Sequence, residues 1–318
     1  MNRLIIVVPC YNEEEALPLT IPVLSEVINN MISKGKIAKS SAVLYVNDGS
    51  RDKTWEVIAA AHEKDSHVFG LNLAGNVGHQ NALLAGLEFA TSLCDMTVSI
   101  DADLQDDVNV IEEMVDKYIA GADVVFGVRN DRTTDSFFKR FTAQGFYKFM
   151  KILGTKTVYN HADYRLLSRR AMEALSLYQE RNIFIRAIVS KMGFVTDTVY
   201  YKRGERNAGE SKYPLKKMLS FAWDGITSFS NKPINMVTGL GFFILLCSLA
   251  AAVYSLCAHF FGQTASGWTS LILSIWFLGG LNLFAIGLVG QYVGKTYIES
   301  KQRPRYIIEK SLTHDSEE

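Results

Sequence analysis

Short apolar runs alternate with longer stretches of helical periodicity in the first half of the chain. The runs have the length of buried strands and lie at residues 4–8, 42–46, 68–73, 96–100 and 124–128. Helical patterns fill the intervals between these runs. The first helix is expected to end near Ser33 and the second to begin at 53–55, and two more are expected over 82–91 and about 110–120. Strands that alternate with helices of this length predict right-handed βαβ units and an α/β domain with a mostly parallel sheet.

Two much longer apolar runs occur nearer the C-terminus, at residues 234–261 and 268–293. Each exceeds the ~20 residues that an α-helix needs to cross a bilayer. An uncharged stretch, 262–267, separates them, and basic residues flank the pair at Lys212, Lys216, Lys217, Lys232, Lys295, Lys301, Arg303 and Arg305. The positive-inside rule then predicts a two-helix transmembrane hairpin with both flanks in the cytosol.

The sequence between these regions has a helical apolar stripe over 214–230, which predicts an amphipathic helix in the membrane interface. We therefore expect four parts: a cytosolic α/β domain (1–212), an interfacial helix (213–232), a transmembrane hairpin (233–294) and a cytosolic tail (295–318). The tail is polar from Ser311 and is expected to fray. Met1-Asn2-Arg3 leads directly into the first strand without a secretory signal, so the head is expected in the cytosol.

Charge and motif content exclude several classes of protein. The chain has 33 basic and 33 acidic side chains, which gives no sign of a nucleic-acid partner. Its four cysteines have no Cys-x-x-Cys spacing, so neither disulfides nor a zinc site is expected. The glycine-rich motifs of dinucleotide oxidoreductases and P-loop ATPases are absent from the sequence.

Polar side chains follow four successive predicted strands, at Asn12, Asp48, Asn76 and Asp101. The carboxyl ends of parallel strands meet at one edge of a sheet, which is where open α/β sheets bind ligands. An isolated Asp-x-Asp, or an Asp-Gly-Ser after a strand, can be simple turn chemistry, but four such groups on one edge favour a binding site.

A carboxylate pair stands at this edge in the segment Asp101-Ala102-Asp103-Leu104-Gln105. Carboxylate and amide oxygens are hard ligands suited to Mg²⁺ or Mn²⁺. Asp101, Asp103 and Gln105 are therefore the candidate metal ligands, and a bound ion would leave positions free for the oxygens of a diphosphate.

The ordered motifs resemble family 2 inverting glycosyltransferases of the GT-A fold. They are Val7-Val8-Pro9-x-Tyr11-Asn12-Glu13-Glu14, Val46-Asn47-Asp48-Gly49-Ser50-x-Asp52-x-Thr54, Asn76-x-Gly78-x-x-x-Ala82 and Asp101-Ala102-Asp103-Leu104-Gln105-Asp106. Glu205-Arg206-x-x-Gly209-Glu210-Ser211-Lys212-Tyr213 resembles the polyprenyl-phosphate subgroup, which includes bactoprenol glucosyltransferases, dolichol-phosphate mannose synthase and the undecaprenyl-phosphate aminoarabinose transferase.

The resemblance implies roles for individual residues. Those that would bind the nucleotide are Pro9, Tyr11, Asn12, Glu13, Asp48, Asn76, Asp101, Ala102 and Arg132. Asp103 would serve catalysis as a metal ligand, and Arg129, like Arg132, would clamp phosphates or be a surface charge. Asp163 matches an acidic residue near the acceptor and would act as a base or position the acceptor. A base is less necessary here, because a phosphate nucleophile with a second pKa of ~6 is already ionised near neutral pH.

Arg206, Ser211 and Lys212 would meet the lipid phosphate, although they could also be an ordinary positive-inside cluster. The expected reaction moves one sugar from a nucleotide sugar, UDP-glucose or UDP-N-acetylglucosamine, to undecaprenyl phosphate at the cytoplasmic face of a bacterial plasma membrane. A processive polysaccharide synthase of the same fold and a non-catalytic membrane scaffold are the alternatives. Glycines at 279, 280, 287 and 290 would allow close helix contact within the hairpin or in a homo-oligomer.

Overall fold

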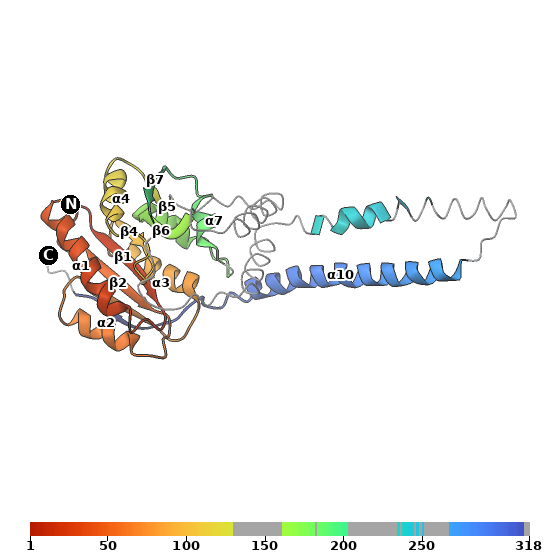
Figure 1. The fold of residues 1–318 in the computed structure, drawn as a ribbon, viewed down its shortest axis with the longest axis horizontal. Helices are drawn as coiled ribbons and strands as arrows, with labels where there is room; N and C mark the ends of the chain where they lie inside the picture. The colour runs from red at the N-terminus through yellow and green to blue at the C-terminus, as the bar shows by residue number, and fades with distance from the viewer. Residues whose placement is uncertain are drawn as a thin grey trace. The chain divides into compact units, whose positions relative to one another are not determined.

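The computed structural model describes residues 1–129, 161–181, 183–202, 234–235, 237–244, 246–247, 250 and 267–314 (Figure 1). The chain divides into two compact units. The first consists of Met1–Arg140, Thr157–Lys212 and Arg303–Glu318, and the second of Phe141–Lys156 and Tyr213–Gln302.

An eight-stranded sheet forms the centre of the first unit. Its strands are β1 (Leu4–Cys10), β2 (Ala42–Asn47), β3 (Val68–Leu73), β4 (Met96–Ser99), β5 (Val124–Arg129), β6 (His161–Ser168), β7 (Thr196–Tyr201) and β8 (Ile308–Leu312). They lie in the order β7-β5-β6-β4-β1-β2-β3-β8. Within this sheet β6 and β8 run antiparallel to their neighbours, and the other pairings are parallel. The predicted α/β fold with a mostly parallel sheet is confirmed.

Helices cover both faces of this sheet, as a parallel sheet with apolar strands requires. One face packs against α1 (Leu17–Ser33), α2 (Thr54–His62) and α4 (Val110–Ile119), and the other against α3 (His79–Thr91), α6 (Arg169–Ser176) and α7 (Ile185–Val189). The alternation of strand side chains separates the two cores: in β1, Ile6 packs on the α1 side and Val7 on the α3 side, both fully buried.

The C-terminal segment corrects one expectation. The prediction that the chain frays from Ser311 is wrong, because Ile308–Leu312 forms β8. This strand pairs with β3, with Leu71 opposite Ser311. The polar sequence gave no sign of this strand, since an edge strand is held by backbone hydrogen bonds and needs no continuous apolar face.

In the second unit, α10 (Trp268–Ser300) covers the second predicted span. Among the described residues one stretch, Phe277–Ser300, is long and apolar enough to cross a membrane. The described residues of the first predicted span, 234–261, are helical. Its remaining residues and the interfacial helix predicted over 213–232 lie outside the described ranges, so the two-span hairpin stays a prediction.

Gly86 tests how closely α3 packs on the sheet. A Cβ at this position would overlap Val7 Cγ1 and lie 2.7 Å from Val46 Cγ2. We expect Gly86→Ala to lower the free energy of unfolding by about 1–3 kcal/mol through overpacking, although alanine normally favours a helix by about 1 kcal/mol. Gly75→Ala is the matched control, because its Cβ meets no atom within 4 Å. Equal thermal unfolding midpoints for the two variants would contradict the packing seen here.

Candidate functional site

The loops that follow β1 and β2 are hydrogen-bonded to each other at the carboxyl edge of the sheet. The Asn12 backbone N–H donates to Ser50 Oγ (2.9 Å), and the Asn12 side-chain oxygen accepts from the Arg51 N–H (2.9 Å). The Glu13 N–H donates to Thr54 Oγ1 (2.8 Å). Asn12 has a left-handed backbone (φ 55°), a conformation that asparagine tolerates better than most residues. Its side chain therefore fixes the loops, while the neighbouring Tyr11 ring stays 41% exposed.

Asp48 binds the loop that follows β3, residues 74–78. Its buried carboxylate accepts hydrogen bonds from the backbone N–H groups of Val77 (2.7 Å) and Gly78 (3.0 Å). The Asn76 amide donates to the Asp48 carbonyl (3.2 Å). Burial raises the pKa of Asp48, and the two N–H groups oppose part of that rise. Gly49 has φ +59°, and a Cβ there would lie 2.5 Å from the Asn76 nitrogen, so glycine is required where the loops meet.

His79, the first residue of α3, brings two predicted site residues together. Its Nε2 lies 3.7 Å from Asp101 Oδ1 and 3.6 Å from Asp163 Oδ2. Burial lowers the pKa of His79, but Asp163 and Asp101 outweigh it and raise the pKa overall. Burial and the neighbouring carboxylates raise the pKa of Asp101, against the opposing effect of His79. His79 could not be predicted from the sequence, because nothing in its spacing shows that both carboxylates reach it.

Asp163, on β6, is bound by several cationic and amide groups. Its carboxylate accepts from Arg186 Nε (3.0 Å) and Nη2 (2.8 Å), from Gln80 Nε2 (3.1 Å) and from Arg165 Nη2. Burial alone would raise the pKa of Asp163, but His79 and the arginines hold it well below the ordinary value. A carboxylate kept ionised in this way is a weak proton acceptor, so the contacts favour the positioning role over the base.

Arg186, on α7, is a further candidate for the site, and no motif in the sequence indicates it. Its side chain is 40% exposed, whereas that of its neighbour Arg165 is 1% exposed. The bidentate contact with Asp163 fixes its guanidinium plane at the site. Arg186 can therefore present charge to an anionic ligand, while Arg165 is an internal counterion.

The candidate metal ligands lie in a tight turn after β4. The Gln105 N–H donates to Asp103 Oδ1 (3.2 Å), and Leu104 between them is left-handed (φ 51°). Buried Ala102 is fixed by its carbonyl, which accepts from Thr20 Oγ1 (2.7 Å). Backbone strain of this kind is typical of ligand-binding loops.

The donor chemistry of this turn fits a divalent cation. Asp101 and Asp103 are partly exposed. Burial and, to a smaller extent, the surrounding acidic groups raise the pKa of Asp101, and a bound cation would offset the repulsion from those groups. The described residues contain no group of three or more His, Cys, Asp and Glu side chains placed to hold a metal. Because Mg²⁺ or Mn²⁺ takes about six ligands, two carboxylates and an amide would leave coordination positions for oxygens of a ligand.

Asp106, at the end of this turn, binds side chains of β5 and β7. Its buried carboxylate accepts from the Tyr201 hydroxyl (2.6 Å) and from Arg129 Nη2 (3.3 Å), and Arg129 Nε donates to the same hydroxyl (3.2 Å). Burial and the Asp106 carboxylate raise the pKa of Tyr201. The predicted phosphate-binding residue Arg129 is thus engaged with Asp106, its side chain 28% exposed. Arg132, Arg206, Ser211 and Lys212 lie outside the described residues.

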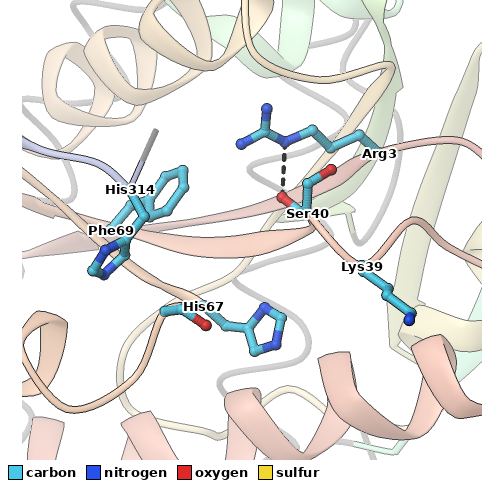
Figure 2. Close-up of a pocket in the computed structure, with 7 residues that line it drawn as sticks. Arg3, Lys39, Ser40, His67, Phe69 and His314 are labelled. Atoms are coloured by element: carbon cyan, nitrogen blue, oxygen red, sulfur yellow. Dashed lines mark hydrogen bonds between the residues drawn. The ribbon is translucent and has the colours of Figure 1, made fainter. Parts of the chain in front are cut away.

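A hollow lies at the other end of the strands, where the residues before β1, β2 and β3 meet the end of β8 (Figure 2). It is lined by Arg3, Lys39, Ser40, Ser66, His67, Phe69 and His314. None of the predicted site residues lines it, so it is separate from the candidate site.

The sequence matches one protein family over more than half of its length and individual relatives over nearly all of it. Residues 5–176 match the family described as Glycosyl transferase family 2. The prophage bactoprenol glucosyl transferase homolog of Escherichia coli K12 is 40% identical over 97% of this chain and 99% of its own. The bactoprenol glucosyl transferase of Shigella phage SfV is 41% identical (96% and 98%), and the uncharacterized glycosyltransferase YkoT of Bacillus subtilis is 51% identical (98% and 93%).

Among solved structures, glucosyl-3-phosphoglycerate synthase from Mycobacterium tuberculosis, in complex with Mn²⁺, UDP-glucose and phosphoglyceric acid, is similar at a TM-score of 0.45. It is 15% identical, and the match covers 71% of this chain and 78% of that one.

The contacts of Asp163 predict that its loss destabilises the fold. Asp163→Asn removes the counterion of buried Arg165, and breaking a buried pair in this way costs about 3–5 kcal/mol. We expect a lower thermal unfolding midpoint, measured on the purified full chain. Asp107→Asn, on a more exposed carboxylate of the neighbouring loop, should leave the midpoint nearly unchanged. An inactive Asp163→Asn protein of full stability would instead favour the base.

Proposed function

Because the chain belongs to glycosyl transferase family 2, we propose that this glycosyltransferase moves glucose from UDP-glucose to undecaprenyl phosphate, with inversion at the anomeric carbon. The observation that carries the proposal is the nearly full-length similarity to proteins named bactoprenol glucosyl transferases, bactoprenol being undecaprenol. The similarity extends through α10 and the predicted hairpin, beyond the residues that match the family.

The donor nucleotide is proposed to bind between the loops after β1, β2 and β3. Asp48 uses two of its carboxylate lone pairs on Val77 and Gly78, which leaves acceptor capacity for a uracil N–H or a ribose hydroxyl. The exposed Tyr11 ring supplies a flat surface for the base. Pro9, Asn12, Glu13 and Asn76 would shape this pocket through the loop contacts described above.

Mg²⁺ or Mn²⁺ is proposed to bind at Asp101, Asp103 and Gln105. Such an ion, when bound, neutralises negative charge that develops on the departing diphosphate. The turn that carries these residues is held from behind by Asp106, so the chain presents its oxygens in a fixed arrangement.

The reaction needs no proton acceptor from the protein. An oxygen of the ionised lipid phosphate forms the new bond to the anomeric carbon, and the bond from that carbon to UDP breaks, its electron pair leaving with UDP. Arg186 and His79 would orient anionic groups here, with Asp163 fixing both side chains. Arg206, Ser211 and Lys212 are proposed to receive the lipid phosphate.

We place the reaction at the cytoplasmic face of a bacterial plasma membrane. α10 is proposed to be one of two spans, and the catalytic unit and both termini are proposed to lie in the cytosol. The basic residues Lys295, Lys301 and Arg303, at and after the end of α10, support this orientation.

Transfer of radiolabel tests the function directly. The full chain in detergent is incubated with undecaprenyl phosphate and labelled UDP-glucose, UDP-N-acetylglucosamine or GDP-mannose, with Mg²⁺, Mn²⁺ or EDTA. We expect one organic-extractable, mild-acid-labile product from UDP-glucose, formed only with a divalent ion. Labelled polymer would indicate a processive synthase, and no product with any donor would favour the scaffold.

Asp103→Ala tests the cation site. Losing one of two carboxylate ligands should lower transfer by about 100-fold or more, because several kcal/mol of charge stabilisation disappear. Helix content, measured by circular dichroism, should not change, since Asp103 is partly exposed and contributes no apolar core. Asp107→Ala, four residues along the same loop, is the control. Full activity of Asp103→Ala would refute the metal-assisted mechanism.

A further inference from the structure

The twelve residues that follow α10 and its terminal turn lie against the catalytic sheet. We call residues 303–314 the strap. They belong to the first compact unit, although α10, which directly precedes them, belongs to the second. β8 is the middle of the strap and forms the edge of the sheet beside β3 (Figure 1).

The first part of the strap binds the start of the loop that carries Asn76. The Ala74 N–H donates to the Ile307 carbonyl (2.9 Å). Asn72 Nδ2 donates to Glu309 Oε2 (2.8 Å), and Asn72 Oδ1 accepts from Asn47 Nδ2 (2.7 Å). Asn47 directly precedes Asp48. Hydrogen bonds thus connect the strap to Ala74, at the start of the 74–78 loop, and through Asn72 to Asn47, the residue before Asp48. These two segments are the ones that the Asp48 carboxylate joins.

The strap also binds α3, the helix that begins with His79. Glu88 on α3 accepts a hydrogen bond from the Tyr306 hydroxyl and lies 3.5 Å from Arg305 Nη2. Arg305 Nη1 donates to the Tyr178 carbonyl (2.9 Å) just beyond α6. Burial, with the nearby Glu88 carboxylate, raises the pKa of Tyr306. The same short segment therefore holds both elements that flank the 74–78 loop.

The C-terminal end of the strap is held near the amino ends of the parallel strands, away from the candidate site. The His314 ring stacks on His62 at 3.9 Å, and its Nε2 lies 3.0 Å from the His62 carbonyl. It closes one side of the hollow shown in Figure 2. Between these two ends the side chains of β8 are mostly exposed, including Ile308 and Lys310. Polar contacts and backbone pairing with β3 thus hold most of the strap, and Tyr306 alone among its described residues also packs against the core. Single changes to the polar contacts can therefore loosen the strap without opening the core.

We propose that the strap fixes the start of the 74–78 loop and the C-terminal half of α3, the two elements between which that loop and His79 are held, and so sets the affinity of the site for its nucleotide. The chain that leaves α10 would then be a structural support of the donor site. The part of this proposal that concerns nucleotide affinity rests on the proposed function, whereas the part that concerns the loop does not.

Glu88→Ala tests the proposal in the full chain, since it removes the partner of both Arg305 and Tyr306. We expect faster amide hydrogen exchange at Val77 and Gly78. We also expect UDP binding in the presence of Mn²⁺ to weaken roughly three- to tenfold, as the loss of one such contact implies. The KM for UDP-glucose should rise by a similar factor, with kcat within about twofold. Glu88→Gln should partly restore the wild-type values, because its amide oxygen still accepts from Tyr306.

Glu309→Ala is a second variant, on an exposed residue that is not needed for folding of the core. It should act in the same direction, because it removes the partner of Asn72. Lys310→Gln on the same strand is the matched control and should match the wild type. Unchanged exchange and UDP affinity in both Glu88→Ala and Glu309→Ala would overturn the proposal. A wild-type protein that neither binds UDP nor transfers glucose would overturn the proposed function alone, because amide exchange requires no ligand.

Discussion

The arrangement of the site depends on one buried negative charge. A carboxylate removed from water is strongly unfavourable unless cations and hydrogen-bond donors surround it. Asp163 meets this requirement by drawing Arg165, Arg186, His79 and Gln80 to one point. These groups come from β6, α7 and the start of α3, so the position of each element is tied to the others. Asp101 joins the cluster through His79, which connects it to the turn after β4.

The rest of the site is organised by side chains that bind backbone groups of neighbouring loops. Asn12 joins the first two loops, Asp48 joins the second and third, and Asp106 holds the fourth against Arg129 and Tyr201. The polar residues that the motifs suggest as ligand contacts therefore also stabilise the loops. Each loop is ordered by its neighbour before any ligand arrives, and such preorganisation lowers the entropy cost of binding.

The sequence predicted those features whose cause is local. The five apolar runs became parallel strands because each is buried on both faces, and Asp48 and Asp101 could be placed because they stand directly after such runs. β6 and β8 could not be predicted in this way, because their pairing depends on strands far away in the chain. The same reason explains why His79 and Arg186 were missed: their importance comes from a carboxylate that only the fold brings near. Assignment of a reaction needed more than local pattern and rests on similarity to known proteins.

The position of β8 has a consequence for the order of assembly. The hydrogen bond between Asn72 and Glu309 joins residues 237 positions apart, so this side of β3 stays unpaired until Glu309 has been synthesised. An unpaired strand such as β3 is a template for pairing with other chains. During synthesis this edge is thus exposed through the period in which the apolar helix α10 is made. Pairing of β8 with β3 then covers this edge, so the segment after α10 protects the sheet from association with other chains.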